Sequence, residues 1–296
     1  MSPRMRGIFP VVQTPLDKEG NLDADSLRRE VAFAIEAGAH GLVYPVLGSE
    51  FQYLSDSERH RMVEVVVSEA SGRVPVVAGV AAPSAPVAVE HATHAAKAGA
   101  DAVIALPPYI SQGSQEEVLQ YYRAISEAAE LPIFVQHSFP GIDAPFLVRL
   151  LREVEHVRYI KEERAPSAHN ISGVIEAAGE ECWGVFGGAL GRWMLSEMRR
   201  GATGFMPATE TTDIYVQIWD AFQAGDEATA RSIFNRLLPL INLAGMLGMR
   251  PLFEVLVRRG VFRTSLMRTP GATEMDEEDH RELEVILEDI RPLFRV

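Results

Sequence analysis

The sequence contains a single cysteine, Cys182, among its 296 residues, so no internal disulfide can form. This excludes a disulfide-stapled scaffold and fits a reducing compartment. Basic residues are also fewer than acidic ones. The sequence has 28 Lys and Arg and 41 Asp and Glu, which gives a formal net charge of −13. Such an acidic chain is poorly suited to bind nucleic acid or an anionic membrane surface. A local site for a small anion is compatible with this balance.

Long apolar runs are absent as well. The longest, between Val74 and Val89, is interrupted by prolines, which excludes a membrane-spanning helix of about 20 residues. The basic and then apolar N-terminus is also broken by prolines and lacks the cleavage pattern of a signal peptide. We therefore expect a soluble, cytoplasmic protein.

Short apolar runs rich in valine and isoleucine alternate with segments of helical periodicity. The runs that predict strands cover residues 7–15, 41–46, 74–80, 102–107, 132–137, 157–163, 182–188 and 201–208. Both faces of these runs are apolar, as expected for parallel strands buried between helices and a core. Ser55 and Ser114, each followed three residues later by glutamate, fit capping boxes, and Asp143 fits another helix start.

Eight such strand–helix units predict an α/β fold, a (β/α)₈ TIM barrel over residues 1–225. The pattern after about residue 212 is entirely helical, with segments 214–224, 228–246, 250–259 and 277–293. Residues 226–296 are therefore expected to form an appended C-terminal helical bundle that packs on the barrel. An open doubly wound sheet is the alternative, but the Gly-rich fingerprint is missing after the first strand.

Lys161 stands at the end of the sixth apolar run. Strand alternation places Lys161 and Glu163 on one face and Ile160 and Glu162 on the other. One interpretation is a Schiff-base lysine with a carboxylate that moves protons. The other is an ion pair that balances charge inside a barrel. Attack needs the neutral amine, which burial favours and a nearby anion disfavours.

Other polar residues follow neighbouring strands. Gly48 and Ser49 allow a turn whose amides could point at a carboxylate, although an ordinary strand–helix turn explains them too. Gln136, His137 and Ser138 are placed at the mouth after the fifth strand. Each could be catalytic or merely buried and hydrogen-bonded.

Several motifs occur in a consistent order along nearly the whole chain. They are Gly7 with Thr14-Pro15-Leu16, Glu50-Phe51 with Leu54-Ser55 and Glu58-Arg59, Pro108-Tyr109, Leu131-Pro132, Ile160-Lys161-Glu162, Gly187-Gly188, Ala224-Gly225-Asp226 and Leu237-Leu238-Pro239. Together they resemble the dihydrodipicolinate synthase/N-acetylneuraminate lyase superfamily of class I aldolases. Ile160-Lys161-Glu162 is the most specific of them, and the resemblance implies that Lys161 forms the Schiff base.

The chain departs from that family where the synthases relay protons. The synthase segment Gly-Thr-Thr-Gly-Glu corresponds to residues 46–50, so the relay threonine maps to Leu47. The strand-five tyrosine maps to Gln136, and the tyrosine lent by a neighbouring subunit maps to Ile110. Synthase and sialic acid lyase activities are therefore not expected. Gln136 together with Lys161-x-Glu163 looks more like the branch that dehydrates 2-keto-3-deoxy sugar acids.

The resemblance implies a catalytic set of Lys161, Glu163, Gln136 and His137. Lys161 would condense with the C2 ketone, and Glu163, or a water that it orients, would remove the C3 proton. The C4 hydroxyl would leave with a proton from Glu163, His137 or Ser49. Substrate binding is expected at a second set, Gly48, Ser49, Met206 and Gly187, of which Gly48 and Met206 would hold the carboxylate end.

Two further functions remain open. An aldolase would use the same imine but break the C3–C4 bond and release pyruvate. A non-catalytic 2-oxo acid binding protein belongs to another class, although the retained Lys161 argues against it. The resemblance also suggests a homotetramer built as a dimer of dimers.

No metal, nucleotide or flavin signature is visible, so no cofactor is expected. His91 and His94 have helical spacing, but they lack a third ligand and are expected on a solvated helix face.

Overall fold

The computed structural model describes residues 4–111, 113–139 and 142–296. In this part of the chain, eight strands alternate with helices. The chain divides into two compact units. The first contains residues up to 9 and 75–206, and the second contains residues 10–74 and 207–296.

The first unit is built on a parallel sheet. Its strands are β1 (Gly7–Ile8), β3 (Val76–Gly79), β4 (Ala102–Ala105), β5 (Ile133–His137), β6 (Val157–Glu162), β7 (Gly184–Gly187) and β8 (Gly204–Phe205). They pair in the order β1-β8-β7-β6-β5-β4-β3. Nearly every strand residue is buried on both faces, as in parallel sheets covered on both sides.

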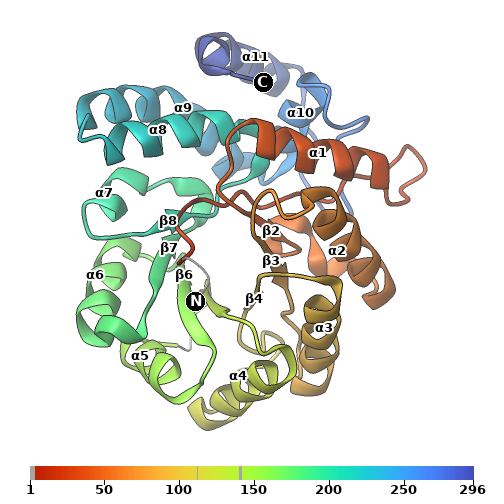
Figure 1. Ribbon diagram of the computed structural model, residues 1–296. Helices are drawn as coiled ribbons and strands as arrows, with labels where there is room; N and C mark the ends of the chain where they lie inside the picture. Colours follow the sequence, from red (N-terminus) through yellow and green to blue (C-terminus); the bar gives the residue numbers. More distant parts are fainter. Residues whose placement is uncertain (1–3, 112, 140–141) are drawn as a thin grey trace. The chain divides into compact units, whose positions relative to one another are not determined.

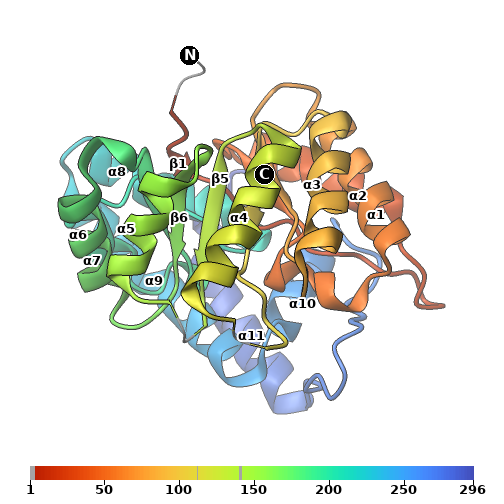
Figure 2. The ribbon, with the colours of Figure 1, turned by 90° about the horizontal axis from the view of Figure 1, so that it is seen from below.

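Helices follow the strands of this unit, as Figures 1 and 2 show. They are α3 (Ala85–Ala98), α4 (Gln115–Ala129), α5 (Ala144–Glu153), α6 (Ser167–Ala178) and α7 (Met194–Met198). The Ser114 hydroxyl accepts from the Glu117 amide and the Glu117 carboxylate accepts from the Ser114 amide, so the predicted capping box is confirmed. The Asp143 side chain accepts from the Phe146 amide and begins α5 as expected.

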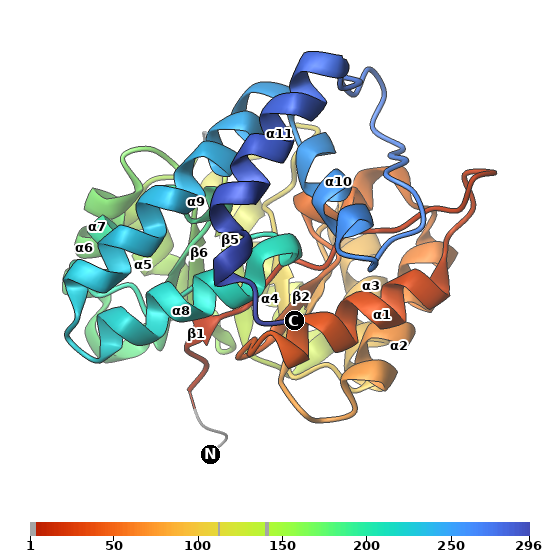
Figure 3. The ribbon, with the colours of Figure 1, turned by 90° about the horizontal axis from the view of Figure 1, so that it is seen from above.

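The second unit holds one strand, β2 (Leu42–Tyr44), and most of its residues are helical. Its helices are α1 (Ala24–Glu36), α2 (Asp56–Ala70), α8 (Thr212–Gln223), α9 (Glu227–Leu247), α10 (Arg250–Arg258) and α11 (Glu277–Ile290). Helix α9 contacts α8, α10 and α11, and Figure 3 shows these four helices together. The capping box at Ser55 and Glu58 begins α2, as predicted.

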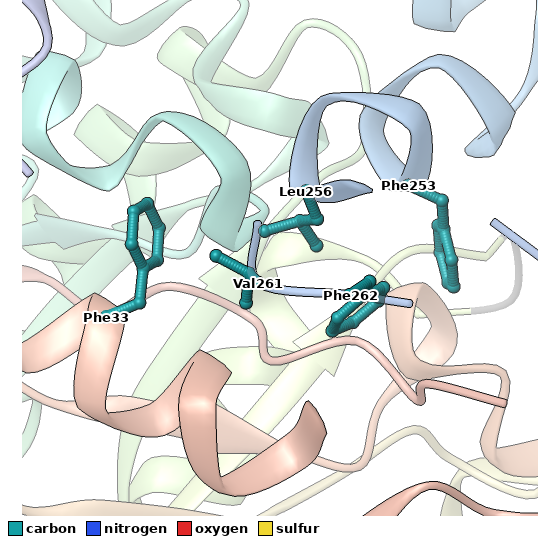
Figure 4. Close-up of a cluster of buried hydrophobic side chains, with 5 residues drawn as sticks. All are labelled: Phe33, Phe253, Leu256, Val261 and Phe262. Carbon is teal, nitrogen blue, oxygen red and sulfur yellow. The ribbon is translucent and has the colours of Figure 1, made fainter. Parts of the chain in front are cut away.

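An aromatic cluster fixes α10 against α1 within the second unit (Figure 4). Phe33 of α1 belongs to one cluster of buried side chains with Phe253 and Leu256 of α10 and with Val261 and Phe262 beyond it, and Figure 4 shows Phe33 and Phe253 at its two ends. The rings of Phe253 and Phe262 meet edge to face at 5.7 Å between centroids, a geometry that adds to the burial of apolar surface. The segment after α10 is thereby anchored to α1.

The predicted strands coincide with the observed ones in order, but several are shorter. Residues 7–15 were expected to form one strand, whereas β1 ends at Ile8 and Val11 makes only isolated bridges to Val43 and Ala208. Pro10 and Pro15 lack the N–H that a continuous ladder requires. Among the described residues, no helix combines the length and the apolar character needed to cross a membrane.

Candidate active site

Lys161 and Glu163 meet at the carboxyl end of β6. Lys161 is the fifth residue of this strand and only 3% of it is exposed. Its Nζ lies 3.2 Å from Oε1 of Glu163, which directly follows the strand. Glu162, which stands between them in the sequence, contacts His137 on the other face of the sheet. The alternation predicted from the sequence is therefore confirmed.

Four donors hold the Glu163 carboxylate. Besides Lys161, Nε2 of Gln136 donates to Oε2 at 2.8 Å, and the Ala189 amide donates to Oε1 at 3.0 Å. The Ser138 hydroxyl also donates to Oε2. Burial raises the pKa of Glu163, but the Lys161 ammonium and these hydrogen bonds outweigh it and lower the pKa to about 2. Glu163 is an anion in this arrangement and orients its neighbours.

Gly188 makes this close packing possible. A Cβ on Gly188 would lie 2.3 Å from both Cγ and Oε1 of Glu163, closer than real side-chain contacts allow. The next two residues, Ala189 and Leu190, have φ of 48° and 57°. Residues other than glycine rarely adopt this left-handed conformation, and the Ala189–Glu163 hydrogen bond stabilises it here.

His137 lies on the opposite face of β5 and β6 from Gln136 and Lys161. Its Nδ1 is 2.7 Å from Oε2 of Glu162, and its Nε2 is 3.1 Å from the Ile142 carbonyl oxygen. The expectation that His137 shares the mouth with Gln136 is therefore wrong, since successive strand residues point to opposite faces. Gln136 and Ser138, by contrast, both reach Glu163.

Glu197 of α7 is a buried carboxylate that sequence reasoning did not select. The Ser167 hydroxyl donates to its Oε1, whereas its Oε2 has no hydrogen-bond partner in the part of the chain that the structure describes. Burial and the nearby charges of Glu162 and Glu163 raise the pKa of Glu197 to about 7, although the Ser167 hydrogen bond opposes this. A glutamate among Met194, Leu195 and Met198 of α7 was the signal that could have found it.

Gly187 and Met206, both predicted to bind substrate, are adjacent in the sheet of the first unit. The Met206 amide donates to the Gly187 carbonyl oxygen at 2.9 Å. The N–H of Met206 is therefore engaged in the sheet. A Cβ on Gly187 would lie 2.3 Å from Oε2 of Glu197, so this glycine makes room for the buried carboxylate.

Gly48 and Ser49 lie in a short 3₁₀ turn of the second unit, η1 (Leu47–Ser49). The Ser49 hydroxyl donates to the Val12 carbonyl at 2.5 Å and accepts from the Val46 amide at 3.2 Å. The hydroxyl of Thr14 donates to the Ser49 carbonyl at 2.6 Å. The Ser49 hydroxyl is thus fully buried and holds the turn together, so its proton is already used.

The helix that carries His91 differs from expectation. His91 is 3% exposed, so it is buried and not on a solvated face as predicted. Three buried alanines of α3, Ala88, Ala92 and Ala95, share the buried face of the helix with His91. Within residues 4–111, 113–139 and 142–296, no group of three or more His, Cys, Asp or Glu side chains is placed to hold a metal ion.

The chain is similar to known enzymes in sequence and in fold. An L-2-keto-3-deoxyarabonate dehydratase of Azospirillum brasilense is 34% identical over 247 residues, which cover 81% of this chain and 80% of that protein. A 4-hydroxy-tetrahydrodipicolinate synthase of Bradyrhizobium diazoefficiens is also 34% identical, over 81% of each chain. The crystal structure of dihydrodipicolinate synthase from Aquifex aeolicus shares the fold, with a TM-score of 0.89, 23% identity and coverage of 99% of this chain and 100% of that one.

The fold and its relatives define a lyase of the class I aldolase superfamily. The profile of the Dihydrodipicolinate synthetase family matches residues 4–290, and the chain belongs to that family.

Proposed function

We propose that the protein dehydrates a 2-keto-3-deoxy sugar acid through an imine on Lys161. The observation that carries the proposal is the buried Lys161–Glu163 pair, with Gln136 and Ser138 on the same carboxylate. The likeness to the A. brasilense dehydratase, which is named for L-2-keto-3-deoxyarabonate, supports this substrate class.

The reaction begins when neutral Lys161 attacks the C2 ketone and water leaves as the iminium forms. The iminium withdraws electrons from C3, so its proton becomes acidic. Loss of that proton gives an enamine, which expels the C4 hydroxyl. One proton and one hydroxide leave together as water, and hydrolysis of the imine returns the lysine.

Glu163 changes its role during these steps. In the resting enzyme, the Lys161 ammonium is the strongest influence that lowers the pKa of Glu163. When Lys161 becomes an iminium, its positive charge spreads onto C2 and two N–H donors are lost. The carboxylate then becomes more basic and can take the C3 proton. Ser138, which donates to Glu163, can pass this proton on: its hydroxyl protonates the departing C4 hydroxyl and takes the proton of the Glu163 carboxyl group in its place, so both side chains return to their starting state.

His137 does not take part as an acid in this proposal, because its ring engages Glu162 and Ile142 on the other face. Gly48 is proposed to bind the substrate carboxylate through its backbone amide. Ser49 is proposed to shape this turn, because its amide donates to the Val46 carbonyl oxygen at 2.8 Å and its hydroxyl donates to the Val12 carbonyl oxygen. Met206 and Gly187 are proposed to shape the site by backbone packing.

Aldol cleavage is the second candidate, because the family includes synthases that use the same kind of chemistry on a 2-oxo acid. The proposal favours dehydration because the family tyrosine maps, by the resemblance, to Gln136, an amide that cannot shuttle protons. The two reactions differ in product. Dehydration removes water only, whereas cleavage of L-2-keto-3-deoxyarabonate releases pyruvate and a two-carbon aldehyde.

The quaternary structure and domain organisation are further proposals. Residues 226–296 are proposed to be an appended helical bundle on a TIM barrel of residues 1–225, in a cytoplasmic enzyme. The homotetramer is proposed from the resemblance to the family. Ile110, to which the tyrosine lent across the dimer maps, is 76% exposed in the single chain. Since isoleucine cannot replace that tyrosine chemically, the usual catalytic reason for a tight dimer is weakened here.

The experiment that tests the function is product analysis with L-2-keto-3-deoxyarabonate. Mass spectrometry should show loss of 18 mass units, the mass of water, without pyruvate, and the Lys161→Ala variant should be inactive. Release of pyruvate in stoichiometric amount would establish the aldolase instead. Tight binding of 2-oxo acids without either product would favour the binding protein.

A further inference from the structure

We propose that His137 and Glu162 form a buried positioning pair on the face of β5 and β6 opposite Lys161. In this inference, the pair sets the geometry of Ser138 and Glu163 for the elimination of water. It rests on the proposed function, because it concerns the step that follows imine formation. No atom of the pair needs to touch the substrate.

The hydrogen bonds define how many protons the pair holds. Nε2 of His137 faces the Ile142 carbonyl oxygen, which only accepts, so Nε2 carries a hydrogen. The 2.7 Å contact between Nδ1 and Oε2 of Glu162 then requires one more proton. Whether that proton sits on the ring or on the carboxyl group, the pair has no net charge. This explains how both side chains can be almost completely buried.

The pair also ties together the segments that follow the two strands. Oε1 of Glu162 accepts from the Arg164 amide at 2.7 Å. The Arg164 guanidinium donates to the Ile142 carbonyl oxygen at 2.7 Å, the same oxygen that His137 approaches. The residue before the cap of α5 and the residue after Glu163 are therefore held by one cluster.

This cluster acts on the site through the backbone. Ser138 directly follows His137, and Glu163 directly follows Glu162, so each member of the pair precedes a residue of the opposite face. The Glu163 amide donates to the His137 carbonyl oxygen at 3.1 Å. This backbone hydrogen bond joins the segment that carries Ser138 to the segment that carries Glu163. A shift of about 1 Å at reacting groups can cost roughly 100-fold in rate.

Three substitutions separate geometry from charge. Glu162→Gln keeps both contacts, because its amide nitrogen can donate to Nδ1 of a neutral His137 and its oxygen can accept from the Arg164 amide. Glu162→Ala and His137→Ala break the pair and leave a buried polar group unsatisfied. A fourth variant, Arg164→Met, removes the side-chain donor that holds the Ile142 carbonyl oxygen, so it loosens the anchor of His137 without removing either member of the pair.

The experiment measures kcat and KM with L-2-keto-3-deoxyarabonate and the rate at which borohydride traps pyruvate on Lys161. Glu162→Ala and His137→Ala should lower kcat roughly 10- to 100-fold, with KM and the trapping rate within about threefold of wild type. Glu162→Gln should stay within about threefold in all three quantities. The double alanine variant should fall no further than the worse single variant, since the two residues act as a unit.

His156→Gln serves as the matched control. His156 also bonds between elements of this unit, through Nδ1 and the Ser126 hydroxyl at 2.8 Å, but it precedes β6 at the amino end. Its loss should lower the melting temperature without changing kcat. Should an alanine variant fail to fold, Arg164→Met tests the inference in its place, and its kcat is expected to fall roughly three- to tenfold.

Three results would each overturn the inference and leave the proposed function standing. They are folded Glu162→Ala with wild-type kcat, Glu162→Gln as slow as Glu162→Ala, and Arg164→Met with unchanged kcat. Failure of the wild-type enzyme to form any adduct would remove the proposed function, and this inference would fall with it.

Discussion

The ammonium of Lys161 lies 3.2 Å from the Glu163 carboxylate in a site where the lysine is almost fully buried. Neither charge is stable there alone, because a buried ion without a partner is costly to desolvate. In the proposed mechanism, the substrate must disturb this pair when it enters, because attack on a 2-oxo acid needs the neutral amine of Lys161.

Replacing Glu163 by glutamine should separate imine formation from turnover. The amide keeps the size of the side chain but cannot take a proton, so turnover of the sugar acid should fall roughly 100-fold or more. Borohydride trapping of pyruvate should persist, because Lys161 is retained. Steady-state kinetics and intact mass check both expectations. Glu180→Gln, an exposed substitution in the same unit, is the control, and wild-type turnover in Glu163→Gln would contradict a role for this carboxylate in proton transfer.

Gly188→Ala should displace Glu163. The added methyl group would lie 2.3 Å from Cγ of Glu163, so the carboxylate must move away from Lys161 and Gln136. Activity should fall roughly 100-fold. Gly173→Ala in α6 is the matched control, because a methyl group there meets nothing within 4 Å. It should retain activity and gain about 0.5–1 kcal/mol of helix stability. Full activity of Gly188→Ala would show that the close packing is dispensable.

Glu197 should make the protein less stable as pH rises. Its pKa is about 7 in the folded state against 4.5 for the ordinary side chain, so the folded state binds the extra proton between these values. The free energy of unfolding therefore falls from about pH 4.5 to about pH 7, by about 3 kcal/mol in total. Urea unfolding should show Glu197→Gln to be more stable than wild type at pH 8 and equal to it at pH 4. The same gain at both values would contradict this linkage.

Glu163 should make the protein less stable as pH falls, the opposite of the dependence expected for Glu197. Because its pKa is lowered to about 2, the anion stabilises the fold fully above about pH 4.5. That contribution, about 3 kcal/mol, is lost as pH falls through 2. Unfolding of wild type and Glu163→Gln should therefore converge below pH 2 and differ most above pH 5. A constant difference over this range would show that the Glu163 charge does not stabilise the folded state.

The sequence predicts the order of the strands and the shared face of Lys161 and Glu163, because both follow from apolar runs and strand alternation. It does not predict the Ala189 amide on Glu163, since a backbone donor in a left-handed turn has no side-chain pattern. His137 was misplaced because it was grouped with its neighbours at the end of β5 and the alternation was not applied to it. Glu197 is buried beside Ser167 and Gly187 by tertiary packing, which its local sequence does not specify.

Borohydride trapping with pyruvate tests the central claim most directly. Intact mass and peptide mapping should find one adduct per chain, confined to Lys161, and none in Lys161→Ala. A wild-type protein that forms no adduct with pyruvate or with a set of 2-keto-3-deoxy acids would contradict the Schiff-base mechanism.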